Sequence, residues 1–178
     1  SPVIEHNKIS GNTTTKNGGG IDCNNADDVI IRNNTISNNL ATNYNGGGIY
    51  CSESSGIVIK ANIIHGNEVQ TRSGGGIYCY NSSVNITNNL IYKNSAPQNY
   101  GGGIYSAGSG ILTLTNNTIA DNIASDARTS GIISFNTQII VVNTIVWNNK
   151  IYCVDSTIDI SYSDIEGGQE AIGTQGSA

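Results

Sequence analysis

The chain has 178 residues, only 12% of them charged, and a formal net charge of −5. Its eight Lys and Arg are scattered singly, which argues against a nucleic-acid partner, and no apolar run reaches the roughly 18 residues of a membrane-spanning helix. The low charge also fits poorly with disorder, whereas the 22 glycines and the many Asn, Ser and Thr residues favour short strands and tight turns.

A repeat that opens with Gly-Gly-Gly-Ile dominates the sequence. Four copies follow one another without a gap and are 28, 28, 27 and 29 residues long. They cover residues 18–45, 46–73, 74–100 and 101–129. Self-similarity at a fixed period of this size indicates a solenoid, a propeller or another repeat array.

A second marker, Asn-x-Ile-x-x-Asn, recurs at spacings of 27, 28, 27, 28 and 26 residues. Its six copies begin at Asn7, Asn34, Asn62, Asn89, Asn117 and Asn143, and a weaker seventh begins at Ser163. If the repeats stack, these Asn residues form a row along the rod, where each amide can donate to and accept from its neighbours. We therefore expect the row to be structural, an asparagine ladder.

Each repeat contains three short runs with the period-2 alternation of a strand. The first is Gly-Ile-Tyr-Cys, the second is the aliphatic run before the Asn marker, such as 84–87, and the third centres on the Ile of the marker. A propeller blade needs about 40 residues and four strands, which these repeats lack. The pattern predicts an all-β fold: a right-handed parallel β-helix solenoid of about six coils of 26–29 residues, with three short strands per coil.

We expect residues 1–178 to form a single β-helix domain that is a fragment of a longer protein. Residues 1–17 are a partial first coil, residues 18–149 are regular coils, and residues 150–178 are the last coil and a candidate C-terminal cap. Because the strand edges at the two ends of such a rod stay unpaired unless something caps them, end-to-end self-association is expected.

The Gly-Gly-Gly-Ile-Tyr-Cys and Asn-Asn-x-Ile-x-x-Asn motifs resemble the repeats of pectate-lyase-like right-handed β-helix proteins. The nearest likeness is to large bacterial cell-surface and secreted proteins, including the polymorphic outer-membrane type, and it extends over nearly the whole chain. The closing stretch 162–168 also resembles the final coils of such surface proteins. The resemblance implies a secreted or cell-surface location in a bacterium. For activity it leaves lyases, hydrolases, epimerases and non-catalytic adhesins open.

In the first strand of each repeat, the residue between Ile and Cys should point outward. Stacking then produces an outward row of Asp22, Tyr50, Tyr78, Tyr105, Ile133 and Tyr152. We predict that Tyr50, Tyr78 and Tyr105 form a ligand-binding aromatic strip, with Tyr44 and Tyr100 on the adjacent loops. Aromatic faces stack on sugar rings and phenol hydroxyls bind sugar hydroxyls, so the predicted ligand is a glycan. The alternative is that the row only packs against itself.

The loops that lead back to the glycines should all emerge at one corner of the rod as a ridge, beside a shallow trough over the glycine rows. Between Asn148 and Ile151 the loop shrinks to two residues, so the ridge should stop there, next to Trp147. Trp147 is either packed at this rim or available for contact with a ligand.

Four cysteines, Cys23, Cys51, Cys79 and Cys153, occupy one register and should point inward. Free buried thiols and a bridge between neighbouring coils both remain open, although stacked positions aim their Cβ atoms alike and would strain a disulfide. Collinear thiols without an aligned His argue against a metal site.

The acidic residues do not form one carboxylate cluster with a base on a single face. The densest groups are Asp22, Asp27 and Asp28 near Arg32, and Asp155, Asp159, Asp164 and Glu166 in the last coil. They lie on different strands or turns, so we assign no catalytic residue, no metal site and no cofactor. Carboxylates of this kind can hold Ca²⁺, but their placement does not indicate it.

The sequence therefore predicts a non-catalytic β-helical module of a secreted or cell-surface bacterial protein. Its expected role is adhesion through a polysaccharide or another host or cell-surface ligand, or display on a rigid rod. The alternative is a segment of a carbohydrate-active enzyme (a polysaccharide lyase, hydrolase or epimerase) whose catalytic coils lie partly outside this chain.

Overall fold

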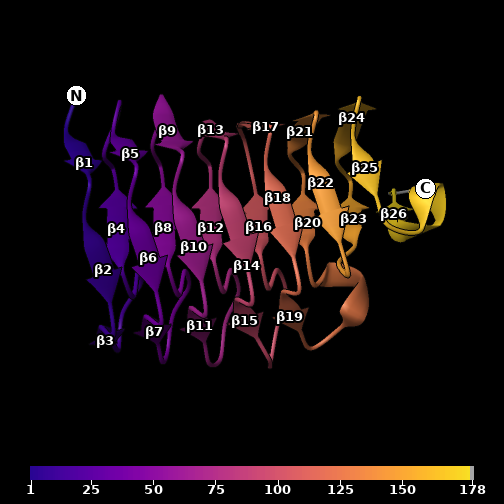
Figure 1. Cartoon of the computed structure of the whole chain (residues 1–178). Helices are drawn as coiled ribbons and strands as arrows, with labels where there is room; N and C mark the ends of the chain where they lie inside the picture. Colours follow the sequence, from indigo (N-terminus) through magenta and orange to yellow (C-terminus); the bar gives the residue numbers. More distant parts are fainter. Residues whose placement is uncertain (177–178) are drawn as a thin grey trace.

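A computed structural model describes residues 1–176, which wind into a rod of stacked coils (Figure 1). The strands pair in parallel with strands of the coils before and after them, as Ile64 does with Ile36 and Ile91. Four sheets therefore run along the rod, and equivalent residues of neighbouring repeats lie in rows.

Each sheet collects one strand from successive coils. Sheet A consists of β1 (Val3–Glu5), β5 (Ile30–Arg32), β9 (Ile57–Lys60), β13 (Val84–Thr87), β17 (Ile111–Thr115), β21 (Gln138–Val142) and β24 (Thr157–Ser161). Sheet B consists of β2 (Lys8–Ser10), β6 (Thr35–Ser37), β10 (Ile63–His65), β14 (Leu90–Tyr92), β18 (Thr118–Ala120), β22 (Ile145–Trp147) and β25 (Asp164–Ile165). Sheet C consists of β3 (Thr13–Thr14), β7 (Leu40–Ala41), β11 (Glu68–Val69), β15 (Ser95–Ala96) and β19 (Ile123–Ala124). Sheet D consists of β4 (Ile21–Asn24), β8 (Ile49–Ser52), β12 (Ile77–Tyr80), β16 (Ile104–Ala107), β20 (Ile132–Phe135), β23 (Ile151–Val154) and β26 (Ile172–Gln175).

The all-β parallel solenoid predicted from the repeats is confirmed, and sheets D, A and B hold its three predicted strands. Sheet C was not expected, because its strands have only two residues each and show no alternation. Four coils, β4–β7 to β16–β19, contribute a strand to all four sheets, and partial coils flank them. The coil count therefore differs slightly from the predicted six.

Side chains from sheets A, B and D fill the interior. Sheet B contributes one aliphatic row, sheet A contributes two, such as Ile57 and Ile59 in β9, and sheet D contributes an Ile row beside the row of cysteines. Ile36, Ile64, Ile91, Ile119 and Val146, the middle residues of consecutive strands in sheet B, are each 0% exposed. The interior forms one continuous apolar cluster, because each coil buries its side chains against the coils on both sides. Sheet C has a separate small cluster of Ala41, Val69 and Ala96.

Two asparagine ladders bind the coils together at the turns on either side of sheet B. In the ladder next to sheet C, the Asn67 backbone N–H and Nδ2 both donate to Oδ1 of Asn94, at 3.1 and 3.0 Å, and Nδ2 also donates to the Ile36 carbonyl at 2.9 Å. The same contacts recur along Asn12, Asn39, Asn67, Asn94, Asn122 and Asn149. The other ladder runs through Asn7, Asn34, Asn62, Asn89 and Asn117. Buried polar groups at the turns are thereby satisfied without water.

The prediction that Asn143 is the sixth member of the second ladder is wrong. The register of β18 and β22 places Thr144 beside Asn117, whose backbone N–H donates to Thr144 Oγ1 at 3.3 Å. Asn143 takes a left-handed turn conformation, with φ of 47°, and its exposed side chain donates to Asn116 Oδ1 at 2.7 Å. Asn is common at left-handed turn positions, and Asn143 completes the Asn-x-Ile-x-x-Asn pattern from such a position. The true ladder position is the next residue, Thr144.

The expected trough over the glycine rows is also wrong, because sheet C covers these glycines. A Cβ on Gly75 would lie 2.5 Å from the Ser95 carbonyl oxygen in β15, and one on Gly47 would lie 2.5 Å from that of Glu68 in β11. The first glycine of the triplet, such as Gly74 with φ of +78°, starts the turn in a left-handed conformation. The triplet is therefore a packing requirement of the corner where the backbone of sheet C approaches.

The C-terminal residues extend sheet D. A 3₁₀ turn, η2 (Gly168–Ala171), leads into β26, which pairs in parallel with β23. Residues 177 and 178 of the candidate cap lie outside the described part of the chain.

Candidate ligand-binding surface

The predicted row of sheet D is present, with Asp22, Tyr50, Tyr78, Tyr105, Ile133 and Tyr152 in register. Its three central rings, which we call the tyrosine strip (Tyr50, Tyr78 and Tyr105), stack face to face. The Tyr50 and Tyr78 centroids lie 5.2 Å apart with an interplanar angle of 9°, and those of Tyr78 and Tyr105 lie 4.8 Å apart with an angle of 3°. The ring faces thus contact one another, so a ligand can reach the strip only along its edge.

The hydroxyl groups of the tyrosine strip point to solvent. Tyr50 is 9% exposed and Tyr78 and Tyr105 are half-buried. Within residues 1–176, no buried side-chain polar atom lacks a hydrogen-bond partner, and none of these three hydroxyls bonds to the protein. Burial, together with the neighbouring phenols, raises the pKa of Tyr78, and burial raises that of Tyr105. The strip therefore presents neutral hydroxyls in a line.

Tyr44 and Tyr100 lie on the loops that precede β8 and β16. Tyr44 is 51% exposed and Tyr100 is 41% exposed. Tyr100 lies against Phe135, with centroids 6.2 Å apart and the rings tilted, and Phe135 in turn lies 5.7 Å from Tyr105. Sequence reasoning missed Phe135, which belongs to the next outward row of sheet D and leans over to end the strip.

The cysteine row is also as predicted in register, and all four thiols are free and buried. The thiol contact with Cys51 and burial raise the pKa of Cys23, and burial raises the pKa of Cys153 to about 11. Since the thiolate is the reactive form, Cys23 and Cys153 are suited to packing rather than to chemistry.

The candidate acids do not converge. Arg32 bonds to Glu5 Oε2 at 2.6 Å, away from the acids it was grouped with, and it holds the pKa of Glu5 below its usual value. Asp27 Oδ1 accepts from the backbone N–H of Ser55 at 2.7 Å and from its hydroxyl at 3.0 Å, and these bonds lower the pKa of Asp27. Within residues 1–176, no three His, Cys, Asp or Glu side chains are placed to hold a metal ion.

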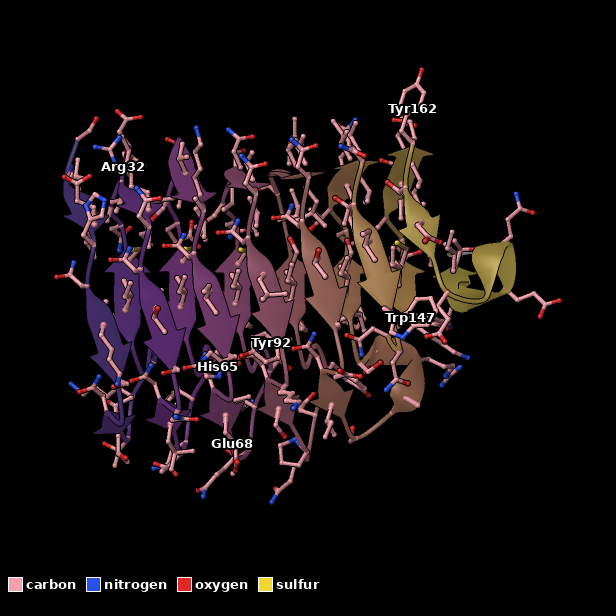
Figure 2. The ribbon with its side chains drawn as sticks, in the orientation of Figure 1. Arg32, His65, Glu68, Tyr92, Trp147 and Tyr162 are labelled. Atoms are coloured by element: carbon pink, nitrogen blue, oxygen red, sulfur yellow. The ribbon has the colours of Figure 1, made fainter. Side chains whose placement is uncertain are left out.

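A second outward surface lies on sheet B and was not predicted as a site. Its outward row is Ser10, Ser37, His65, Tyr92, Ala120 and Trp147. Figure 2 labels His65, Tyr92 and Trp147 of this row. His65 and Tyr92 stack with centroids 4.9 Å apart and an interplanar angle of 18°. The alanine then interrupts the row of rings before Trp147, which is 53% exposed.

Beside this row the corner of the rod is open, because sheet C ends at β19. An open hollow of about 640 Å³ occupies the place where the next strand of sheet C would lie. It is lined by Lys93, Asp121, Asn122, Ile123, Ala124, Ala127, Ser130 and Asn148. The loop ridge therefore ends near Trp147, as expected. The hollow beyond its end is a concave surface of the size that small ligands occupy.

Residues 1–119 match the family described as "Right handed beta helix region", and the chain belongs to this family. The match agrees with the parallel solenoid and with the predicted handedness. No curated protein matches the chain. Within the described residues, no helix has the length and apolar character needed to cross a membrane.

Proposed function

We propose that the chain is a non-catalytic module of a secreted or cell-surface bacterial protein and that it acts in adhesion by binding a glycan at the tyrosine strip. Low charge and a surface rich in Asn, Ser and Thr support this location, as does the resemblance of the repeats to the pectate-lyase-like superfamily and to polymorphic outer-membrane-type proteins.

The observation that carries the proposal is the parallel stack of Tyr50, Tyr78 and Tyr105. Its ring separations of 4.8–5.2 Å hold three hydroxyls at fixed, nearly equal spacing on a rigid sheet. Each phenol hydroxyl can donate and accept a hydrogen bond, as each sugar hydroxyl can. Because the stack already fixes the side chains, binding loses little side-chain entropy. A line of hydroxyls matches a long polar ligand.

Replacement of hydroxyls tests this function without removing rings. The double variant Tyr78→Phe/Tyr105→Phe keeps the stack and deletes two hydroxyls, whereas Tyr162→Phe, at a side chain that is 89% exposed and distant from the strip in sequence, is the matched control. Wild type and both variants are applied to a glycan array, and products are analysed by mass spectrometry. Binding lost only in the double variant, without product, supports the proposal.

Two other results would replace the proposal. Cleaved or epimerised sugar would assign the chain to the carbohydrate-active enzymes. If neither the wild type nor the control variant binds any glycan, the chain acts as a rod for display or protein contacts, and its tyrosine strip serves only packing.

A further inference from the structure

The outward row of sheet B contains an interrupted stack of rings. Tyr92 has one face against His65, with centroids 4.9 Å apart. Its other face is directed along the rod toward Ala120, whose side chain is a single methyl group. Trp147 follows one coil further on, so a ring is missing between two rings in the same row.

The width of this gap matches one inserted ring. Neighbouring parallel strands lie about 4.8 Å apart, so Tyr92 and Trp147 originate from strands about 9.6 Å apart. A ring placed midway would lie about 4.8 Å from each neighbour. That separation is the one at which the rings of this rod already stack, at 4.8 Å for Tyr78 and Tyr105. The gap therefore has the dimensions of a sandwich site for one ring.

Polar groups surround the gap on the side of the open corner. Lys93, Asp121 and Asn148 directly follow Tyr92, Ala120 and Trp147 in sequence, and all three line the hollow of about 640 Å³. Asp121 Oδ1 accepts from Asn148 Nδ2 at 2.8 Å, which fixes both side chains. The site thus combines apolar faces with an ammonium, a carboxylate and an amide.

We propose that this gap, the Tyr92–Trp147 notch, binds one pyranose ring of a polysaccharide. The C–H faces of a sugar ring stack on aromatic rings, and its hydroxyls reach the carboxylate of Asp121, the amide of Asn148 and the ammonium of Lys93. The hollow accommodates the adjoining sugar residues. This inference goes beyond the proposed function, because the notch lies on sheet B and needs no contribution from the tyrosine strip.

Sheet D contains a similar arrangement, an alanine between two aromatic residues of one row, but there one of the two rings packs against other side chains. Tyr80, Ala107 and Phe135 are also consecutive members of one row, in sheet D. There, Phe135 is half-buried and its ring lies against Tyr105 and Tyr100. Trp147 has no such ring contact within the described residues, so of these two gaps only the one in sheet B is open.

The test uses the fluorescence of Trp147, because the chain contains a single Trp. The whole chain is titrated with cellohexaose, xylohexaose, chitohexaose and hexagalacturonate. We expect at least one of them to shift the Trp emission in a saturable manner. Ala120→Tyr completes the stack and occupies the notch, so it should weaken this ligand by about tenfold or more while the fold is retained. Ser10→Tyr adds the same ring to the same row, far from the notch, and should bind as the wild type does.

The outcomes separate this site from the tyrosine strip. Loss of the response in Ala120→Tyr but not in Ser10→Tyr or Tyr78→Phe/Tyr105→Phe supports the notch. A response that persists in Ala120→Tyr, or no response to any of the four sugars up to about 10 mM, overturns it. Array binding that depends only on the tyrosine strip would preserve the proposed function and still overturn the notch.

Discussion

The regular corner of the rod and its open corner differ by one short strand. Around Gly47 and Gly75, sheet C covers the glycines so closely that their Cβ atoms would meet backbone oxygens at 2.5 Å. Ser130 occupies the position that Gly75 and Gly102 hold in the two preceding repeats. No strand of sheet C covers it, because sheet C ends at β19. The serine side chain is accommodated there, with Oγ donating to the Ala127 carbonyl at 2.9 Å. The glycine triplet therefore marks where the corner is covered, and its loss marks where the corner opens.

The open corner also shows how the edge of a missing strand is satisfied. In the regular coils the backbone carbonyl of a ladder Asn accepts from the next strand of sheet C, as Asn94 accepts from the Ile123 N–H at 2.8 Å. The Asn122 carbonyl instead accepts from Asn149 Nδ2 at 2.9 Å. One side-chain amide thus replaces a strand, and the space outside it becomes the hollow beside Trp147.

The largest expected effect comes from adding a methyl group to the covered corner. Gly75→Ala places a Cβ 2.5 Å from the Ser95 carbonyl oxygen, so backbone must move, and we expect the free energy of unfolding to fall by about 3 kcal/mol. Ser130→Ala creates the same residue at the equivalent open position. It removes a hydroxyl that donates to the Ala127 carbonyl and accepts from Asn149 Nδ2 at 3.3 Å, and it should cost about 1 kcal/mol. Urea unfolding measures both. Equal losses would contradict the role of sheet C in selecting glycine.

A smaller loss of stability is expected when Asn149, which satisfies the backbone of Asn122 at the open corner, is replaced. Asn149 is 4% exposed, and its amide bonds to the backbone carbonyl of Asn122, while its Oδ1 accepts from the Asn122 N–H at 3.1 Å. Asn149→Ala leaves these buried backbone groups without partners and should lower the free energy of unfolding by about 2 kcal/mol. Asn12→Ala, at the exposed start of the same ladder, should lower it by less than about 1 kcal/mol. If Asn12→Ala lowered the free energy of unfolding as much as Asn149→Ala does, the proposed capping role of Asn149 would be wrong.

The architecture was predictable because its determinants repeat. Inward Ile residues, ladder Asn residues and outward Tyr residues recur with one period, and stacking in register turns each of them into a row. The repeat length varies by a residue or two, so it does not fix the register alone. Asn143, at the left-handed turn position, was therefore assigned to the ladder position that Thr144 occupies, 27 residues after Asn117.

The covered corner and the notch were not predictable from local pattern. Strands of two residues in sheet C have no alternation to detect, so the glycines they cover were interpreted as an exposed trough. The notch depends on Ala120 lying between two aromatic residues 55 positions apart in the chain, Tyr92 and Trp147. Only the register of three coils brings these residues together. The tyrosine strip was found because its members follow the Gly-Gly-Gly-Ile motif directly.

The smallest expected effect concerns the tyrosine strip, and it appears only at alkaline pH. Burial raises the pKa of Tyr78 and of Tyr105 above that of an unfolded Tyr, which is about 10. A raised folded-state pKa means that the stabilisation is complete below pH about 10 and is lost as the pH rises toward the folded value, since the unfolded chain releases its protons first. The midpoint of thermal unfolding should therefore fall as the pH rises above about 10.

The double variant Tyr78→Phe/Tyr105→Phe isolates this contribution, because it has no phenol to ionise at these positions while the stacked rings remain. Its thermal midpoint should fall less between about pH 9 and pH 11 than that of the wild type. Tyr162→Phe, at a side chain that is 89% exposed, should follow the wild type and thereby controls for the ionisation of other groups. Parallel pH profiles for the wild type and the double variant would mean that water reaches the strip freely. In that case burial would not keep these hydroxyls protonated above about pH 10, although the stacked rings would still hold them in line.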